Sequence, residues 1–381
     1  MKKVLLTHAR VLAEDGLRDG LAVLLDGGRI EAVLEAGDAR PEGAQIHDLE
    51  GRTLLPGFID VQVNGGGDAL FNDAPTVETI RRIGAAHRRY GTTGFLPTLI
   101  SDDVEVMRAA IEATAAAIDA GVPGVLGVHL EGPYIAPERR GAHDAAKFRV
   151  PDAREIDLVC SLRNGVTVLT LAPERVAPEQ VREFVARGVI VCLGHSAATY
   201  EQARAALDAG ARGFTHLYNA MSPLQGRAPG MVGAALEDRH SWCGLIADGH
   251  HVHAAALRVA LAAKPRGRLL LVTDAMPPVG GARDTYALAG ETITCRDGRC
   301  ESADGVLAGS ALDMAAAVRN AVATLGIDLA EAARMASTYP ADFLGLAHSH
   351  GRIAAGMRAD LVELDASLDV QRSWISGVAS P

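Results

Sequence analysis

The chain has 381 residues, 48% of them hydrophobic, which fits one α/β barrel of about 250 residues with a small companion domain. The formal net charge of −10 disfavours non-specific nucleic-acid binding, which needs a basic face, but allows an anionic substrate at a local group of cations. No stretch of about 18 residues is apolar and free of charge, so we expect no membrane span.

The first 52 residues have the composition of short strands separated by turns. Residues 4–13 and 21–35 are rich in Leu and β-branched side chains, and the turn Asp26-Gly27-Gly28 lies inside the second stretch. A similar composition returns at residues 285–300 and 351–365. We expect the two ends of the chain, 1–52 and 347–381, to pair into a small β-sandwich domain.

Between these ends, short apolar runs alternate with stretches such as 77–90 and 104–120, where apolar residues recur at helical spacing. This alternation predicts a parallel (β/α)8 barrel over residues 53–346, with a helical tail from about 308. A doubly wound open sheet is the main alternative, but it usually has fewer strands and does not explain the matched ends. The eight apolar runs are 53–63, 91–100, 124–130, 166–172, 188–195, 213–219, 243–249 and 269–275.

Four polar residues lie at or near the carboxyl ends of these runs: Glu131, His195, His216 and Asp274. Each has a structural explanation when taken singly, such as a buried structural histidine or, for Asp274, a helix N-cap. Barrel enzymes, however, build their active sites at that end from several strands. The coincidence of four such residues therefore favours a function.

One carboxylate and two imidazoles make a three-ligand metal set that leaves a position open for water. We expect Glu131, His195 and His216 to bind one divalent ion, zinc in the first place, although iron, manganese and cobalt accept the same ligands. Asp274 would take the proton of the water and pass it to a leaving nitrogen. No Gly-x-Ser-x-Gly motif occurs at a strand end, which disfavours a serine hydrolase.

Two segments favour an anionic, hydroxyl-rich ligand. Arg227 lies in a Gly/Pro-rich loop that could bind a phosphate through backbone N–H groups and a guanidinium. An exposed arginine in a flexible turn is an equally weighted alternative. The segment 248–253 carries three histidines, which could form a second metal site, but we favour donors to phosphate or sugar oxygens.

Eight motifs follow one another between about residues 20 and 365: PGFIDVQVNG, GTTGFLPT, HLEGPY with GAHD, GHSAAT, THLYNAM, RAPGMVGA, ADGHHVH and LVTDAM. In this order they resemble the N-acetylglucosamine-6-phosphate deacetylases of the amidohydrolase superfamily. The segment GRIAAGMRADLVELD resembles the closing β-segment of that superfamily.

The resemblance implies hydrolysis of the acetyl group of N-acetyl-D-glucosamine 6-phosphate, in amino-sugar catabolism or cell-wall sugar recycling. It implies Asp274 as the catalytic acid/base, His143 beside the acetyl carbonyl, and the same three metal ligands. It also implies a homodimer in which Arg227 reaches the phosphate of the neighbouring site. The substrate-binding positions that it implies are Ala142, Asn219, Ala220, Arg227, His251, Leu307, Ala308 and Gly309.

Many members of the superfamily carry His-x-His after the first barrel strand, where this chain has Gln62-Val63-Asn64. An amide is a poor zinc ligand beside imidazole, so we expect the second metal position to be weak or absent. Three alternative substrates remain: N-acetylgalactosamine 6-phosphate, an N-acyl-amino acid and a cyclic amide. A non-catalytic protein that kept the barrel is the alternative from another class.

The five cysteines are scattered and odd in number. Cys160, Cys192 and Cys243 lie in apolar surroundings and are expected as reduced core thiols. Cys295 and Cys300 could pair, but we expect two free thiols in a hairpin. With a start that lacks the apolar run of a signal peptide, this cysteine usage predicts a cytoplasmic protein.

Overall fold

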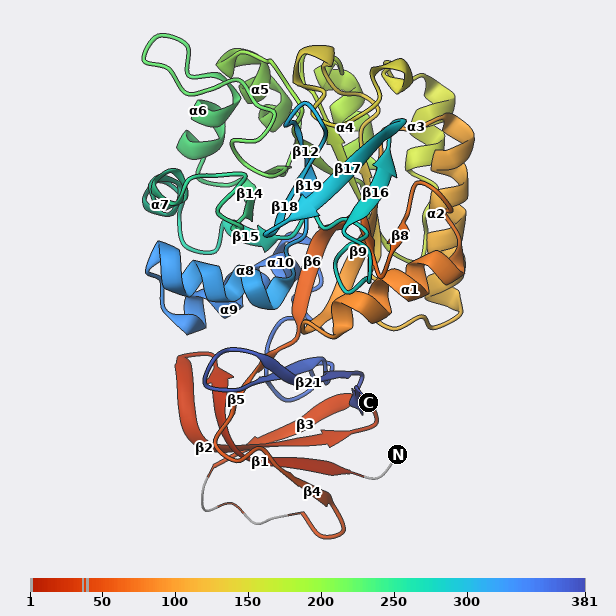
Figure 1. The fold of residues 1–381 in the computed structure, drawn as a ribbon. Helices are drawn as coiled ribbons and strands as arrows, with labels where there is room; N and C mark the ends of the chain where they lie inside the picture. Colours follow the sequence, from red (N-terminus) through yellow and green to blue (C-terminus); the bar gives the residue numbers. More distant parts are fainter. Residues whose placement is uncertain (1–2, 36–37, 39–40, 381) are drawn as a thin grey trace.

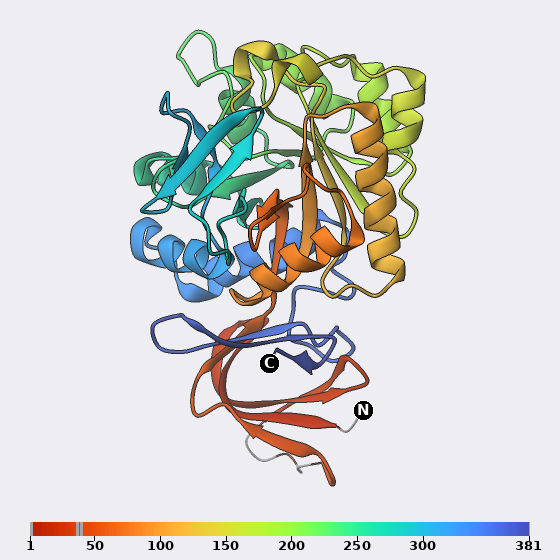
Figure 2. The same ribbon diagram turned by 45° about the vertical axis from the view of Figure 1, so that its right-hand side comes forward.

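The structure, a computed structural model, describes residues 3–35, 38 and 41–380. A barrel surrounded by helices forms the larger body, and a smaller β-body lies below it (Figures 1 and 2). Both ends of the chain lie in the smaller body (Figure 1). This arrangement confirms the predicted barrel with a small β domain.

The smaller body is built around one eight-stranded sheet that joins the two ends of the chain. The carboxyl-terminal strands enter it through antiparallel pairing of β20 with β5. Leu6, Val23, Leu54 and Trp374 pack in its buried core. Its strands are β1 (Val4–Ala13), β2 (Gly16–Asp26), β3 (Arg29–Leu34), β4 (Gln45–Asp48), β5 (Thr53–Pro56), β20 (Leu361–Leu364), β21 (Val370–Ile375) and β22 (Val378–Ala379).

The barrel wall is a sheet of eight parallel strands in sequence order, which correspond to the eight predicted runs. The first run divides at Gly57, so that residues 53–56 join the small sheet and only 58–63 enter the barrel. A Cβ on Gly57 would lie 2.0 Å from Thr93 Oγ1, so only glycine fits at this crossing. The strands are β6 (Phe58–Val63), β9 (Thr92–Ile100), β10 (Gly127–Glu131), β11 (Val166–Leu171), β12 (Ile190–Leu193), β13 (Gly213–Phe214), β14 (Trp242–Ile246) and β15 (Leu269–Val272).

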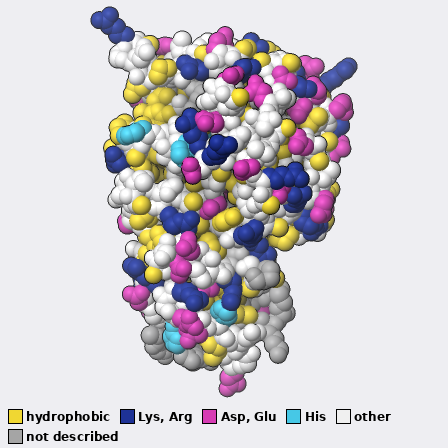
Figure 3. Space-filling model, viewed as in Figure 1, with side chains coloured by type: hydrophobic (Ala, Val, Ile, Leu, Met, Phe, Trp, Pro, Cys, Tyr) yellow, Lys and Arg dark blue, Asp and Glu magenta, His cyan; other side chains and the backbone are white. Residues whose placement is uncertain are grey.

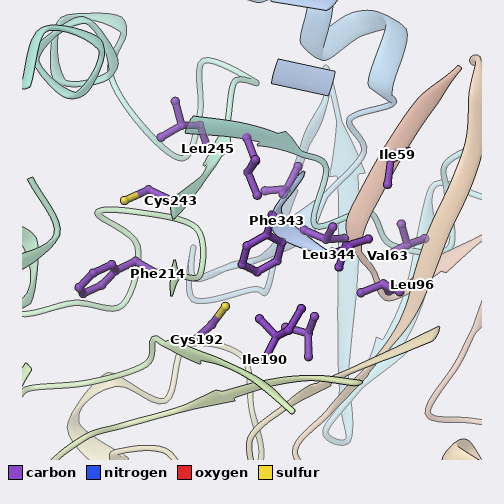
Figure 4. Packing of buried hydrophobic residues seen from close by; sticks show 14 of the residues in the cluster. Ile59, Val63, Leu96, Ile190, Cys192, Phe214, Cys243, Leu245, Phe343 and Leu344 are labelled. Atoms are coloured by element: carbon purple, nitrogen blue, oxygen red, sulfur yellow. The ribbon is translucent and has the colours of Figure 1, made fainter. Parts of the chain in front are cut away.

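Helices cover the outside of the barrel, and several begin with a side-chain cap. Asp152 and Glu155 form a reciprocal capping box at α3, as Thr199 and Gln202 do at α5. Phe343 of α10 packs among side chains of the barrel strands, including Cys192 (Figure 4). The helices are α1 (Val77–Arg88), α2 (Val104–Asp119), α3 (Ala153–Val159), α4 (Pro178–Ala186), α5 (Tyr200–Asp208), α6 (Gly230–Glu237), α7 (Ala254–Ala263), α8 (Met314–Asn320), α9 (Leu329–Ala336) and α10 (Thr338–Phe343).

None of the helices in the described part of the chain combines the length and hydropathy that a bilayer crossing requires.

After the last barrel strand, the chain forms a separate antiparallel sheet of four strands in front of the barrel (Figure 1). This sheet contains residues 285–300, whose composition resembles that of the small domain but which do not join it. A two-stranded ribbon, β7 (Gly65–Gly66) with β8 (Ala69–Leu70), follows the first barrel strand. The four strands are β16 (Thr285–Leu288), β17 (Glu291–Arg296), β18 (Arg299–Glu301) and β19 (Leu307–Ser310).

Cys295 and Cys300 form a disulfide across β17 and β18, so the expectation of two free thiols was wrong. The antiparallel register places the two residues directly opposite each other, with their Cα atoms 4.0 Å apart. Sequence spacing alone did not fix that register, because a turn one residue longer would have separated the side chains. Cys160, Cys192 and Cys243 are buried free thiols, as expected.

The disulfide predicts a thiol count. Protein denatured without reductant should react with a thiol reagent at three cysteines, and at all five after reduction. Five reactive thiols before reduction, in protein purified without reductant, would contradict the pairing.

Candidate active site

A cavity of about 500 Å³ lies at the carboxyl ends of the barrel strands. The β16–β19 sheet and its loops form one of its walls through Leu288, Arg299, residues 305–307 and Gly309. Figure 3 shows Lys and Arg side chains gathered on the face that carries this sheet. Most of the residues predicted for the site line this one cavity: Glu131, Ala142, His143, His195, His216, Asn219, Ala220, His251, Asp274, Leu307 and Gly309.

Glu131, His195 and His216 converge at the floor of the cavity. Glu131 ends β10, while the two histidines follow β12 and β13. Glu131 Oε1 lies 3.2 Å from His195 Nε2 and 3.0 Å from His216 Nε2, and the two nitrogens are 3.0 Å apart. All three side chains are buried. Burial alone would raise the pKa of Glu131, but hydrogen bonds from the two histidines and their charges hold that pKa well below its usual value.

This donor set fits a divalent metal ion. The Nδ1 atom of His195 donates to the carbonyl oxygen of Arg139 at 2.8 Å, so in the neutral ring Nε2 carries the lone pair that a metal ion would take. One carboxylate oxygen and two imidazole nitrogens are ligands of the kind that zinc takes in three-ligand catalytic sites. Among the described residues, no other group of three or more His, Cys, Asp or Glu side chains has this geometry.

Two of the candidate ligands, and Asp274 beside them, have left-handed backbone conformations. His195, His216 and Asp274 have φ values of 47°, 32° and 53°, where non-glycine residues are uncommon. Each lies two residues after the last residue of a barrel strand. Strained backbone of this kind persists where the surrounding structure fixes it, and it is concentrated at functional sites.

Asp274 lies beside the three candidate ligands, held by two amide side chains. Its Oδ1 accepts hydrogen bonds from Asn64 Nδ2 at 2.6 Å and from Gln62 Nε2 at 3.1 Å. Gln62 Nε2 also lies 3.1 Å from Glu131 Oε1. Burial and then the charge of Glu131 raise the pKa of Asp274 to about 6. The two amides thus fix the orientation of a carboxylate whose pKa lies close to neutrality.

From the sequence, Gln62 and Asn64 were interpreted only as poor metal ligands, and their hydrogen bonds to Asp274 were not predicted. Their position at the end of the first barrel strand was the available signal.

His143 lies above the ligand set, with its ring centroid 4.4 Å from that of His195. Its Nδ1 accepts from the backbone N–H of Ser101 at 3.3 Å and lies 2.8 Å from the Ser101 hydroxyl. A backbone N–H can only donate, so Nδ1 is unprotonated and the neutral ring carries its hydrogen on Nε2. Burial and then the charge of His195 lower the pKa of His143 to about 3. The ring is therefore a neutral hydrogen-bond donor.

The histidine-rich segment after β14 does not form a second metal group. His251 Nδ1 lies 2.6 Å from Asp248 Oδ2, and both side chains are nearly buried. His250 contacts the carbonyl oxygen of Asp297, and His253 caps the amino end of α7. Of the three histidines, only His251 lines the cavity.

Two predicted positions do not line this cavity. Ala308 is buried in the core between the β16–β19 sheet and the barrel. Arg227 is exposed on the loop that leads into α6, which projects from the body (Figure 1). The loop is closed by a pair of hydrogen bonds between the backbones of Gln225 and Ala228. Within one chain, this arginine therefore lies outside the cavity.

The side-chain arrangement predicts the metal content of the purified protein. Gln62 and Asn64 direct N–H donors at Asp274, and a donor cannot bind a cation, so the groups they present beside the candidate ligands do not suit a second ion. We expect elemental analysis to give about one divalent ion per chain, with the other metals near background. Two stoichiometric ions would contradict this reading of the amides.

Comparison with known proteins places the chain in a family. The model of the amidohydrolase family matches residues 53–379. The chain is 44% identical over 370 residues to an N-acetylgalactosamine-6-phosphate deacetylase of Shewanella sp. (strain ANA-3), covering 97% of this chain and 94% of the relative. It is 40% identical over 347 residues to the N-acetylglucosamine-6-phosphate deacetylase of Homo sapiens, covering 87% and 84%. The crystal structure of N-acetylglucosamine-6-phosphate deacetylase from Pasteurella multocida superposes with a TM-score of 0.96 at 36% identity, covering 99% of both chains.

Proposed function

The chain belongs to the amidohydrolase family, and we propose that it hydrolyses the acetamide of N-acetyl-D-glucosamine 6-phosphate to give D-glucosamine 6-phosphate and acetate. The observation that carries the proposal is the convergence of Glu131, His195 and His216 beside Asp274 in one cavity. Relatives and a solved structure that match over most of their length are named for this reaction or for its galactosamine counterpart.

In the proposed mechanism, Glu131, His195 and His216 would hold one divalent metal ion, zinc in the first place. When bound, such an ion supplies Lewis acidity that polarises a carbonyl and lowers the pKa of water. Asp274 accepts the proton of the attacking water at its carboxylate. His143 donates from Nε2 to the carbonyl oxygen as negative charge develops on it. Asp274 then returns the proton to the amine nitrogen as the C–N bond breaks.

The remaining cavity residues hold the sugar phosphate in this proposal. Asn219, Ala220 and His251 line the cavity and would bind the sugar phosphate. Ala142, Leu307 and Gly309 would contact the sugar and its acetyl group, with Ala308 packed behind them in the core. In a homodimer, Arg227 would bind the phosphate of the substrate that occupies the site of the neighbouring subunit. Its exposed position on a projecting loop supports this assignment.

Arg227→Ala should raise KM for the phosphorylated sugar at least about tenfold and change kcat little, because the lost contact is the same in the ground and transition states. Steady-state kinetics measures both constants. Arg239→Ala, which removes another exposed arginine, is the control. An unchanged KM, or a protein that sediments as a monomer with full activity, would contradict the assignment.

N-acetyl-D-galactosamine 6-phosphate is the second candidate substrate, because the relative at 44% identity is named for it. A panel of the two N-acetylhexosamine 6-phosphates, the same sugars without phosphate, an N-acetyl-amino acid and a cyclic amide would test the proposal. Amine release should require the phosphate, and the ratio of kcat/KM between the two epimers identifies the substrate. Equal turnover of the unphosphorylated sugars, or hydrolysis of the cyclic amide alone, would overturn the proposal.

We further propose that the catalytic domain lies within residues 53–346, of which 53–56 pair with the small sheet, and that the protein is cytoplasmic. A phosphate ester carries nearly two negative charges at neutral pH, which confine a sugar phosphate to the compartment where it is made.

A further inference from the structure

Asp274 lies at the seam where the barrel closes, between β15 and β6. The other neighbouring strands of the barrel are joined by parallel ladders. At this seam, the backbone is joined by one isolated bridge between Val63 and Ala275, with a hydrogen bond from Asp274 N to Gln62 O at 3.0 Å. Ala275 O also accepts from the N–H groups of Asn64 and Gly65, at 3.0 and 2.9 Å. The pairing at this seam is therefore short, and side-chain contacts add to the backbone bonds that hold Asp274 in place.

A buried carboxylate crosses the seam directly below Asp274. Asp60 of β6 is fully buried, and its Oδ2 accepts from the hydroxyl of Thr273 at 2.5 Å. Its Oδ1 accepts from the backbone N–H of Gln62 at 3.1 Å and from that of Thr273 at 3.4 Å. One carboxylate thus joins the strand that carries Gln62 to the residue that precedes Asp274.

Ser310 of β19 binds the peptide group between Thr273 and Asp274. Its hydroxyl donates to the carbonyl oxygen of Thr273 at 2.6 Å, and its N–H donates to the carbonyl oxygen of Asp274 at 2.9 Å. Ser310 ends β19, directly after Gly309, which lines the cavity. Asp274 has φ at 53°, so the backbone here depends on such contacts to keep its conformation.

We propose that Thr273, held between Asp60 and Ser310, is a positioning residue that sets the place of the Asp274 carboxylate. The hydroxyl of Thr273 fixes its peptide against β6, and Ser310 fixes the same peptide against the cavity wall. Together they keep Asp274 Oδ1 within reach of Asn64 Nδ2. The inference rests on the proposed function only for the role of Asp274 in the reaction.

Thr273→Val removes the hydroxyl while keeping the shape of the side chain, and Thr273→Ser restores the hydroxyl. We expect Thr273→Val to lower kcat about 10- to 100-fold with KM for N-acetyl-D-glucosamine 6-phosphate unchanged within about threefold, because a shift of about 1 Å at a reacting group has an effect of this size. Thr273→Ser should keep kcat within about threefold of the unmodified protein. Loss of kcat to the same degree in both variants, or a Thr273→Val protein with normal kcat, would overturn the inference.

Thr92→Val is the matched control. Thr92 is a buried threonine at the amino end of β9, away from the cavity, and its hydroxyl has no partner among the described residues. The substitution should leave kcat unchanged. If Thr273→Val does not fold, Ser310→Ala tests the same clamp by removing the 2.6 Å bond, and we expect kcat to fall about five- to tenfold. A normal kcat in Ser310→Ala would then overturn the inference.

A crystal structure of Thr273→Val supplies a result that does not depend on activity. Asp274 Oδ1 should move out of hydrogen-bonding distance of Asn64 Nδ2, which is 2.6 Å in the unmodified protein. An unmoved Asp274 would overturn the inference. If the unmodified protein does not hydrolyse the sugar phosphate, the proposed function fails, while this structure still decides the role of Thr273.

Discussion

Asp274→Asn should lower kcat about 10²–10⁴-fold, the range that general acid–base catalysis contributes, while leaving KM and bound metal close to those of the unmodified protein. The carbonyl oxygen of the new amide can still accept from Asn64 and Gln62, so the side chain keeps its position. The substitution thus removes the proton acceptor and little else. Metal should be retained, because the three converging ligand atoms belong to other residues.

Steady-state kinetics and elemental analysis of the same Asp274→Asn preparation measure these quantities. Asp157→Asn is a suitable control, because Asp157 is an exposed surface carboxylate that pairs with Arg187. Deacetylation by Asp274→Asn within tenfold of the normal rate would remove Asp274 from its proposed role. Loss of the metal together with the activity would show that Asp274 is needed for the metal and not only for proton transfer.

The barrel could be predicted from the sequence because its signal is local and repeated. A buried parallel strand is a short apolar run, and an amphipathic helix follows it, so each unit carries its own pattern. Contacts between distant segments gave weaker signals. The division of the first run at Gly57 depends on its close approach to Thr93, and the disulfide depends on the register of β17 and β18.

In the candidate site, too, some residues could be predicted from the sequence and others could not. Glu131, His195, His216 and Asp274 could be found because a barrel places the ends of its strands on one rim, whatever the details of packing. The contacts of Gln62, Asn64 and Ser101 depend on side-chain orientations across the cavity. No spacing in the sequence encodes these, and a glutamine or serine at a strand end is ordinary. The left-handed conformations of His195 and Asp274 were equally invisible, since neither residue type requires them.

Glu131→Gln should lower the metal content from about one ion per chain to less than about one tenth and kcat/KM about 10³-fold. Even substitutions of residues that only support a ligand typically weaken metal binding about 10- to 100-fold, and Glu131 provides the only carboxylate among the three converging ligand atoms. Glutamine has nearly the same size, so the cavity should keep its shape. The amide, however, lacks the negative charge, and one of its two polar atoms is a donor that cannot bind a cation.

Thermal unfolding with and without added zinc separates metal binding from catalysis. A ligand that binds the folded state raises Tm, so zinc should raise the Tm of the chelator-treated unmodified protein and leave that of Glu131→Gln nearly unchanged. Glu179→Gln, at an exposed carboxylate of α4, should respond to zinc like the unmodified protein. A Glu131→Gln protein with a full zinc response would contradict the ligand set, because the ion would then be bound by other groups. A lost response with normal hydrolysis would instead show that the reaction needs no metal at Glu131.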